Sequence, residues 1–198
     1  MEESFTLGMS LMDFLPPIAF LLGAFSLVKL ARHQHNQTSS WLLTIGGIIT
    51  FLSGLLQAIW KFLYTLGIGD IRILRDQQFV LMALGFLLMF LGVLMFVRKE
   101  RTAPAMAAMA AWKIPFLATM TLCSIGMEGI LTHYAFQKGM RLAGALFIVA
   151  VLCLFAMSGM ASGEQSASRQ WIEQSINLIG QSAFALGSYL LYRQAARP

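Results

Sequence analysis

Two charged side chains in apolar surroundings are the residues of this chain most suited to chemistry. Lys61 lies near the end of one long apolar run, and Glu128 lies well inside another. A charge is costly in such surroundings, so it usually faces the interior of a helix bundle and has a partner there. The two residues therefore predict a polar binding site enclosed by apolar helices.

Helical spacing groups further polar side chains with each charge. Gln57, Trp60 and Lys61 fall at i, i+3 and i+4, which places them on one face of a helix. Ser124 and Glu128 are four residues apart and share a face in the same way. If the two helices are neighbours, Lys61 and Glu128 could form an ion pair that binds a polar solute or a cation.

The last apolar run carries a broad stripe of amides. Its polar residues gather on one side of a helix, and they are Gln170, Glu173, Gln174, Asn177, Gln181 and Ser188. Amides can line a path for a polar solute, and they can equally hydrogen-bond between helices and specify packing. The candidate ligand-binding set is Gln57, Trp60, Lys61, Ser124, Glu128, Glu173, Gln174, Asn177 and Gln181.

Each charge also has a purely structural interpretation. Lys61 could extend to the membrane surface, where Trp60 and Tyr64 would belong to an interfacial aromatic belt. A pair between Lys61 and Glu128 could simply hold two helices together. The sequence leaves these alternatives open.

The composition defines the elements that must position these residues. Hydrophobic residues make up 58% of the 198-residue chain and charged residues 12%, whereas soluble domains average about 45–50% and about 25%. A membrane-spanning helix needs about 20 mostly apolar residues. Six runs qualify, joined by short loops: Leu11–Leu30, Trp41–Tyr64, Gln78–Val97, Trp112–Tyr134, Leu142–Gly163 and Gln170–Tyr192. The expected fold is an all-α, multi-pass bundle of six transmembrane helices forming a single domain over residues 1–198.

Three helices in each half would allow an inverted repeat, because a three-helix unit copied in tandem must flip. Gly85 and Gly92 in the first half have the same spacing as Gly180 and Gly187 in the second. Glycines at this spacing are also common where membrane helices approach closely. An inverted 3+3 repeat is therefore one of two interpretations of the spacing.

Basic residues in short loops set the orientation of a membrane protein. Lys29 and Arg32 follow the first run, whereas the segment before it holds Glu2, Glu3 and no base. If successive helices alternate in direction, seven basic residues fall on each face of the membrane. The charges that flank the first helix therefore determine the predicted orientation. We predict an N-terminus outside, in a plasma membrane, and the net charge of +5 fits basic loops facing anionic lipid and calls for no nucleic acid.

The chain lacks the residue sets of several enzyme and cofactor classes. Three histidines and two cysteines, Cys123 and Cys153, give no metal-ligand spacing, so neither a metal nor a cofactor is expected. No nucleotide-binding loop or serine-nucleophile elbow occurs. Glu128 and His133 could serve a lipid-modifying enzyme as acid and base, but five residues apart on a helix they point in different directions.

Two function classes are favoured over this lipid-modifying enzyme, which stays a third alternative. The first is a transporter or membrane solute-binding subunit with a polar site between the second, fourth and sixth runs. The second is a structural or accessory protein that binds a protein partner through the fifth run, where small residues gather. These are Cys153, Ser158, Gly159 and Ser162.

Overall fold

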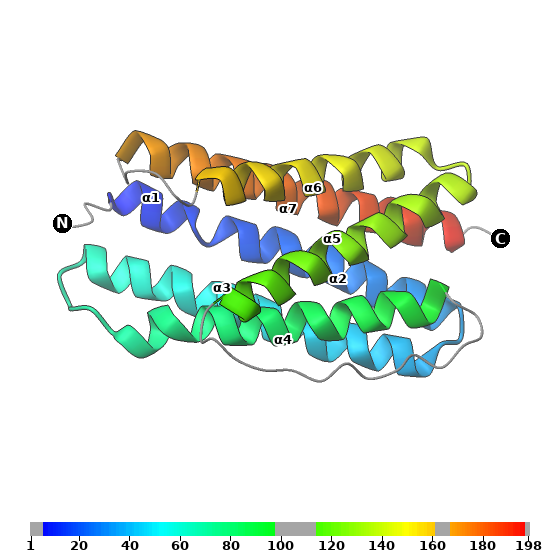
Figure 1. Ribbon diagram of the computed structural model, residues 1–198, viewed down its shortest axis with the longest axis horizontal. Coiled ribbons are helices and arrows are strands. Elements are labelled where there is room, and N and C mark those ends of the chain that lie inside the picture. Colours follow the sequence, from blue (N-terminus) through cyan, green and yellow to red (C-terminus); the bar gives the residue numbers. More distant parts are fainter. Residues whose placement is uncertain (1–5, 98–113, 161–166, 197–198) are drawn as a thin grey trace.

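The computed structural model describes residues 6–97, 114–160 and 167–196, and every regular element among them is an α-helix (Figure 1). Seven helices are present in this part of the chain. They are α1 (Leu7–Met12), α2 (Leu15–His33), α3 (Gln37–Thr65), α4 (Arg72–Val97), α5 (Ile114–Gln137), α6 (Arg141–Met160) and α7 (Ala167–Ala195). The predicted all-α class is confirmed.

The first predicted helix is two helices. The hydroxyl of Thr6 accepts a hydrogen bond from the Met9 amide and caps α1, which ends at Met12. Pro16 and Pro17 occupy the first turn of α2, where their missing N–H groups have no helical partner to lose. The chain therefore bends at Asp13 and Phe14, and this bend turns out to position a charged residue.

Three spans are long and apolar enough to cross a membrane within the described residues. They are Leu7–His33 with its bend, Gln37–Thr65 and Arg72–Val97. In the second half, α6 contributes a shorter apolar segment, Arg141–Met157. Helix α7 is continuous, but the amide stripe interrupts its apolar sequence. The six predicted spans are thus supported in part. Trp112 and Gly163, the predicted limits of two of them, lie outside the described residues.

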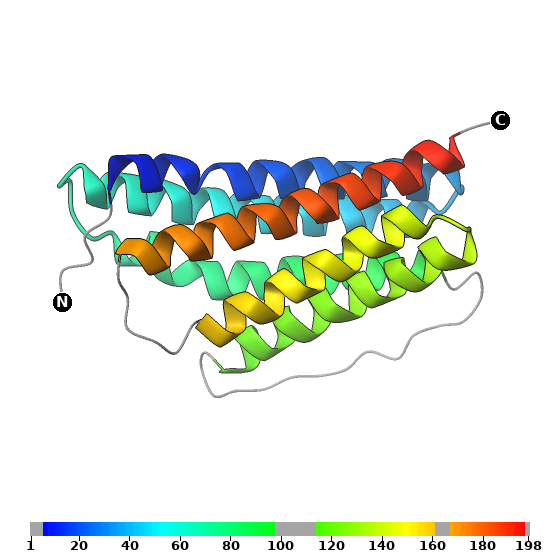
Figure 2. The same cartoon turned by 90° about the horizontal axis from the view of Figure 1, so that it is seen from above.

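The helices from α2 to α7 form a closed ring. Each packs against the next along the chain, and α7 packs against α2 to complete the circle (Figures 1 and 2). The short α1 packs against α3, α2 and α7. This arrangement gives every long helix one face toward the centre of the bundle.

The directions of the helices do not alternate throughout. α4 and α5 run the same way, because Phe90 of α4 packs against Gly126 of α5 and Phe96 stacks edge-on with Tyr134 further along both helices, at 5.6 Å between ring centroids. Helices α2, α4, α5 and α7 consequently all begin at one end, here called the N-terminal end (Figures 1 and 2). α3 runs opposite to α5 and α7, whereas the alternating helices assumed in the sequence analysis would give these three one direction, so that assumption is wrong.

The two halves of the ring repeat the same hairpin. The turn between α2 and α3 has His35 at a positive φ of 56°, and the turn between α5 and α6 has Gly139 at 72° in the equivalent place. In both turns a backbone amide reaches back five residues, from Asn36 to Ala31 and from Met140 to Ala135. The repetition continues into the core, where equivalent residues have no exposed surface: Leu27 and Leu131, Ala31 and Ala135, Leu43 and Phe147.

The glycine pairs noted in the sequence occupy equivalent interfaces. Gly85 and Gly92 of α4 lie against α3, where Cβ atoms would meet Gly46 and Leu43. Gly180 and Gly187 of α7 lie against α6 in the same manner, at Cys153 and Phe147. The last helix of each half therefore packs on the middle helix through the same two positions. The first helix of each half, α2 or α5, begins at the N-terminal end, so the two halves form a parallel repeat. The inverted 3+3 repeat, one of two interpretations of the glycine spacing, is therefore not the arrangement found.

Candidate functional site

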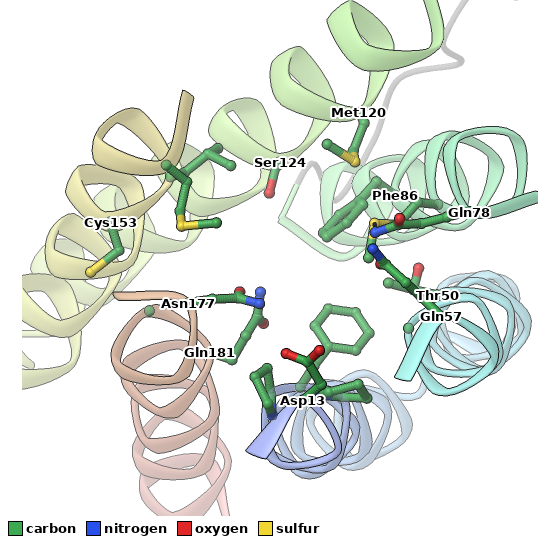
Figure 3. Close-up of a pocket in the computed structure, with 18 of the residues that line it drawn as sticks. Asp13, Thr50, Gln57, Gln78, Phe86, Met120, Ser124, Cys153, Asn177 and Gln181 are labelled. Carbon is green, nitrogen blue, oxygen red and sulfur yellow. Dashed lines mark hydrogen bonds between the residues drawn. The ribbon is translucent and has the colours of Figure 1, made fainter. Parts of the chain in front are cut away.

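A cavity of about 440 Å³ lies inside the ring, toward the N-terminal end (Figure 3). All six long helices contribute to its wall. The wall is apolar in part, with Phe20, Phe86 and several methionines. Its polar part consists of Asp13, Thr50, Gln57, Lys61, Gln78, Thr121, Ser124, Glu128, Glu173, Gln174, Asn177 and Gln181.

The structure brings most of the predicted site residues to this one cavity. Eight of the nine line it: Gln57, Lys61, Ser124, Glu128, Glu173, Gln174, Asn177 and Gln181. They come from α3, α5 and α7, the three helices that the sequence selected. Their common location makes the cavity the candidate site.

Lys61 pairs with Asp13, a residue that the sequence patterns did not assign to the site. Its Nζ lies 2.8 Å from Oδ2 of Asp13, and the two side chains are 16% and 6% exposed. Asp13 occupies the bend between α1 and α2, which turns its carboxylate toward the cavity (Figure 3). No ion pair joins Lys61 to Glu128 among the described residues, so the expected pair is replaced by one with Asp13.

Glu128 lies deep in the wall, and no described basic side chain forms an ion pair with it. The residue is 7% exposed, and its Oε2 has no hydrogen-bond partner within the described part of the chain. An unpaired buried carboxylate is costly, because burial removes the water that stabilises the charge. Thr132, one turn further along α5, donates its hydroxyl hydrogen to the Glu128 backbone carbonyl at 2.7 Å.

Trp60 is the predicted residue that lies elsewhere. Its indole N–H donates to Oδ1 of Asp70 at 2.9 Å, and Arg75 lies 3.0 Å from the other oxygen of the same carboxylate. The Arg75 guanidinium also sits over the Trp60 ring, 5.8 Å from its centroid. Trp60 therefore anchors the loop between α3 and α4, and helical spacing could not separate it from Gln57 one turn earlier.

The amide stripe of α7 faces the cavity over its first half. Asn177 and Gln181 point into the space opposite Gln57 and Gln78 (Figure 3). Glu173, nearer the start of the helix, pairs with Arg169 at 3.3 Å. Amides on opposite walls can each donate and accept, so a solute between them finds both kinds of hydrogen-bond partner.

Sequence reasoning missed several wall residues. Asp13 lies before a proline pair that begins a new helix, and the prolines are the only local signal for the bend. Thr50, Gln78 and the two phenylalanines Phe20 and Phe86 are single positions in apolar runs, without a spacing pattern of their own. Their place in the wall follows from the ring arrangement, which a local pattern does not encode.

Only two of the residues predicted to bind a protein partner through α6 have described surroundings. Cys153 lines the cavity, and Gly159 has open space around it. Ser162 and the side chain of Ser158 lie outside the described residues. Within that part of the chain, no group of three or more His, Cys, Asp or Glu side chains could hold a metal ion.

No protein-family model, curated protein or solved structure matches this chain. Its function must therefore be inferred from the site itself.

Proposed function

We propose that this chain is a multi-pass membrane protein that binds a small polar solute within its helix ring, as a transporter or a solute-binding subunit does. The distribution of side chains supports a lipid environment. Large apolar residues point outward around the ring, among them Leu22 (60% exposed), Leu122 (69%) and Leu152 (60%). Polar groups gather inside. Contiguous apolar surface of this kind needs a partner, and lipid covers it on all sides.

The charge distribution supports one orientation in that membrane. The end opposite the N-terminal end carries five described basic residues, and no described acidic residue lies there. The five are Lys29, Arg32, Lys138, Arg141 and Arg193. The N-terminal end carries four described bases, one fewer than the opposite end, and they are Lys61, Arg72, Arg75 and Arg169. Basic ends face the cytoplasm. The N-terminal end with its cavity therefore faces outward, as the first helix predicted.

The parallel course of α4 and α5 adds a topological consequence. Val97 and Ile114 lie toward opposite ends of the bundle, so α4 and α5 enter the membrane from the same face (Figure 2). In this orientation α1 begins at the outer face and α7 ends at the inner face.

The observation that carries the solute-binding proposal is the convergence of polar side chains from separate helices on one partly open cavity. Packing alone would need each amide to meet a partner across a helix interface. Asn177 and Gln181 instead face open space that Gln57 and Gln78 border from the other side. A cavity of about 440 Å³ falls within the usual range for small-molecule sites.

Replacing Gln181 by leucine should weaken the binding of a solute that stabilises the wild type. The leucine removes a hydrogen-bonding group from the cavity wall and leaves its counterpart on the solute unpaired, at a cost of about 1–3 kcal/mol, or about fivefold to 150-fold in affinity. The measurement is a thermal-unfolding screen in lipid nanodiscs against amino acids, amines, vitamins and sugars, because a ligand of the folded state raises the melting temperature.

Gln194→Leu provides the matched control. It makes the same chemical change on the same helix, at an exposed position outside the cavity wall. The proposal expects this variant to keep the full stabilisation by the solute. If no solute stabilises the wild type, or if both variants lose stabilisation equally, the cavity is not a solute site.

A further inference from the structure

We propose that the solute is an organic cation whose positive group binds beside Glu128. This inference rests on the proposed function, because it specifies what the same cavity recognises. It follows from three features of the wall: its balance of charge, its aromatic and amide surfaces, and the absence of a metal-binding cluster in the described residues.

The ionisable side chains of the wall are compensated with one exception. Lys61 neutralises Asp13 at 2.8 Å. Arg169, just outside the wall, lies 3.3 Å from Glu173. Glu128 has no ion-pair partner among the described residues and no hydrogen bond to its Oε2. The wall therefore presents one carboxyl group that no cationic side chain partners within the described part of the chain, and an incoming organic cation would supply the counter-charge that favours its ionised form.

The rest of the wall suits the body of an organic ammonium ion. Phe20 and Phe86 pack edge to face, with centroids 5.6 Å apart, and both contribute to the cavity. Aromatic faces attract cations and pack against apolar groups. Asn177 and Gln181 supply amide oxygens that accept hydrogen bonds from N–H groups (Figure 3).

A metal ion fits this site less well than an organic cation. Transition metals need clustered His, Cys or carboxylate ligands, and the described residues contain no such group of three. The volume of about 440 Å³ also exceeds what a single ion occupies and approaches that of an organic ligand site. An ammonium group on a small carbon skeleton satisfies both the charge and the space.

The test uses three probes of nearly equal shape: benzylammonium, benzyl alcohol and benzoate. Their binding to the protein in nanodiscs is measured by calorimetry at one pH. We expect benzylammonium to bind, and the neutral and anionic probes to bind at least tenfold more weakly. Glu128→Gln should weaken benzylammonium binding by about 30-fold or more, because truncating one member of a buried charge pair typically costs 2–5 kcal/mol.

Two further variants separate charge recognition from damage to the fold. Glu128→Asp keeps the charge and should recover part of the affinity that Glu128→Gln loses. Asp76→Asn removes an acid that is 42% exposed and lies outside the wall, and it should leave binding unchanged. Equal binding of benzoate or benzyl alcohol, or full affinity in Glu128→Gln, would overturn the cation inference while leaving solute binding in place. Failure of all three probes would overturn it too, and the Gln181→Leu screen decides separately whether the cavity binds any solute.

Discussion

Replacing Lys61 by methionine should lower the free energy of unfolding by about 3–5 kcal/mol, the cost of leaving one member of a buried ion pair without its partner. The loss arises at Asp13, whose side chain is 6% exposed and would keep a buried, uncompensated carboxylate. Because Asp13 lies at the bend between α1 and α2, the pair also fixes this bend against α3. The measurement is denaturant-induced unfolding of the purified protein in a lipid-like environment.

Two comparisons make this prediction specific. The double variant Lys61→Met with Asp13→Asn should regain most of the lost stability, because no charge then remains unpaired. Arg75→Met removes one side of an exposed pair, in which Arg75 is 42% and Asp70 is 34% exposed. It should cost about 1 kcal/mol or less. Equal losses for Lys61→Met and Arg75→Met would show that the Asp13–Lys61 pair is not buried in the membrane-embedded protein.

The second prediction with a large effect concerns membrane topology, because each introduced cysteine is labelled from one membrane face and not from the other. Single cysteines at Ile68 and Lys138, placed in a chain whose Cys123 and Cys153 are replaced by alanine, should react with an impermeant maleimide from opposite membrane faces. Ile68 is 63% exposed in the loop between α3 and α4, and Lys138 is exposed in the turn between α5 and α6. The structure places these two loops at opposite ends of the bundle (Figure 1).

An alternating six-span topology gives the contrary result for the same pair. It would put Ile68 and Lys138 on one face, whichever way the protein is inserted. A cysteine at Gln194, near the C-terminus, extends the experiment: the parallel arrangement expects labelling from the same face as Lys138, which we assign to the cytoplasm. Labelling of Ile68 and Lys138 from the same face would contradict the parallel course of α4 and α5.

Local sequence patterns were sufficient for the helices and for most of the site. The runs Trp41–Tyr64 and Gln170–Tyr192 fall inside α3 and α7, because apolar length is a local property. Helical spacing also placed Ser124 and Glu128 together, and both line the cavity. These predictions depend only on the rise and turn of an α-helix.

The remaining features depend on contacts between distant segments. Nothing near Glu128 indicates that α5 runs parallel to α4, and the even division of basic residues followed from assuming that the helices alternate. The partner of Lys61 was missed for a related reason, because Asp13 reaches the cavity only through the bend before Pro16. The turn at His35 repeats that at Gly139 with a different residue, so the repeat is visible in backbone and burial more than in residue identity.

The most direct test of the central claim, a solute-accessible cavity inside a lipid-facing ring, compares Ser124→Cys with Leu122→Cys in the same cysteine-free chain. Both residues lie on α5. Ser124 is 4% exposed and lines the cavity, whereas Leu122 is 69% exposed on the outer face. In membranes, a charged, impermeant methanethiosulfonate applied to the outer face should modify the cysteine at 124 and spare the one at 122, because water fills the cavity and lipid covers the outer face. Rapid modification at 122 with none at 124 would contradict the account, since it would show a water-exposed outer surface and a closed interior.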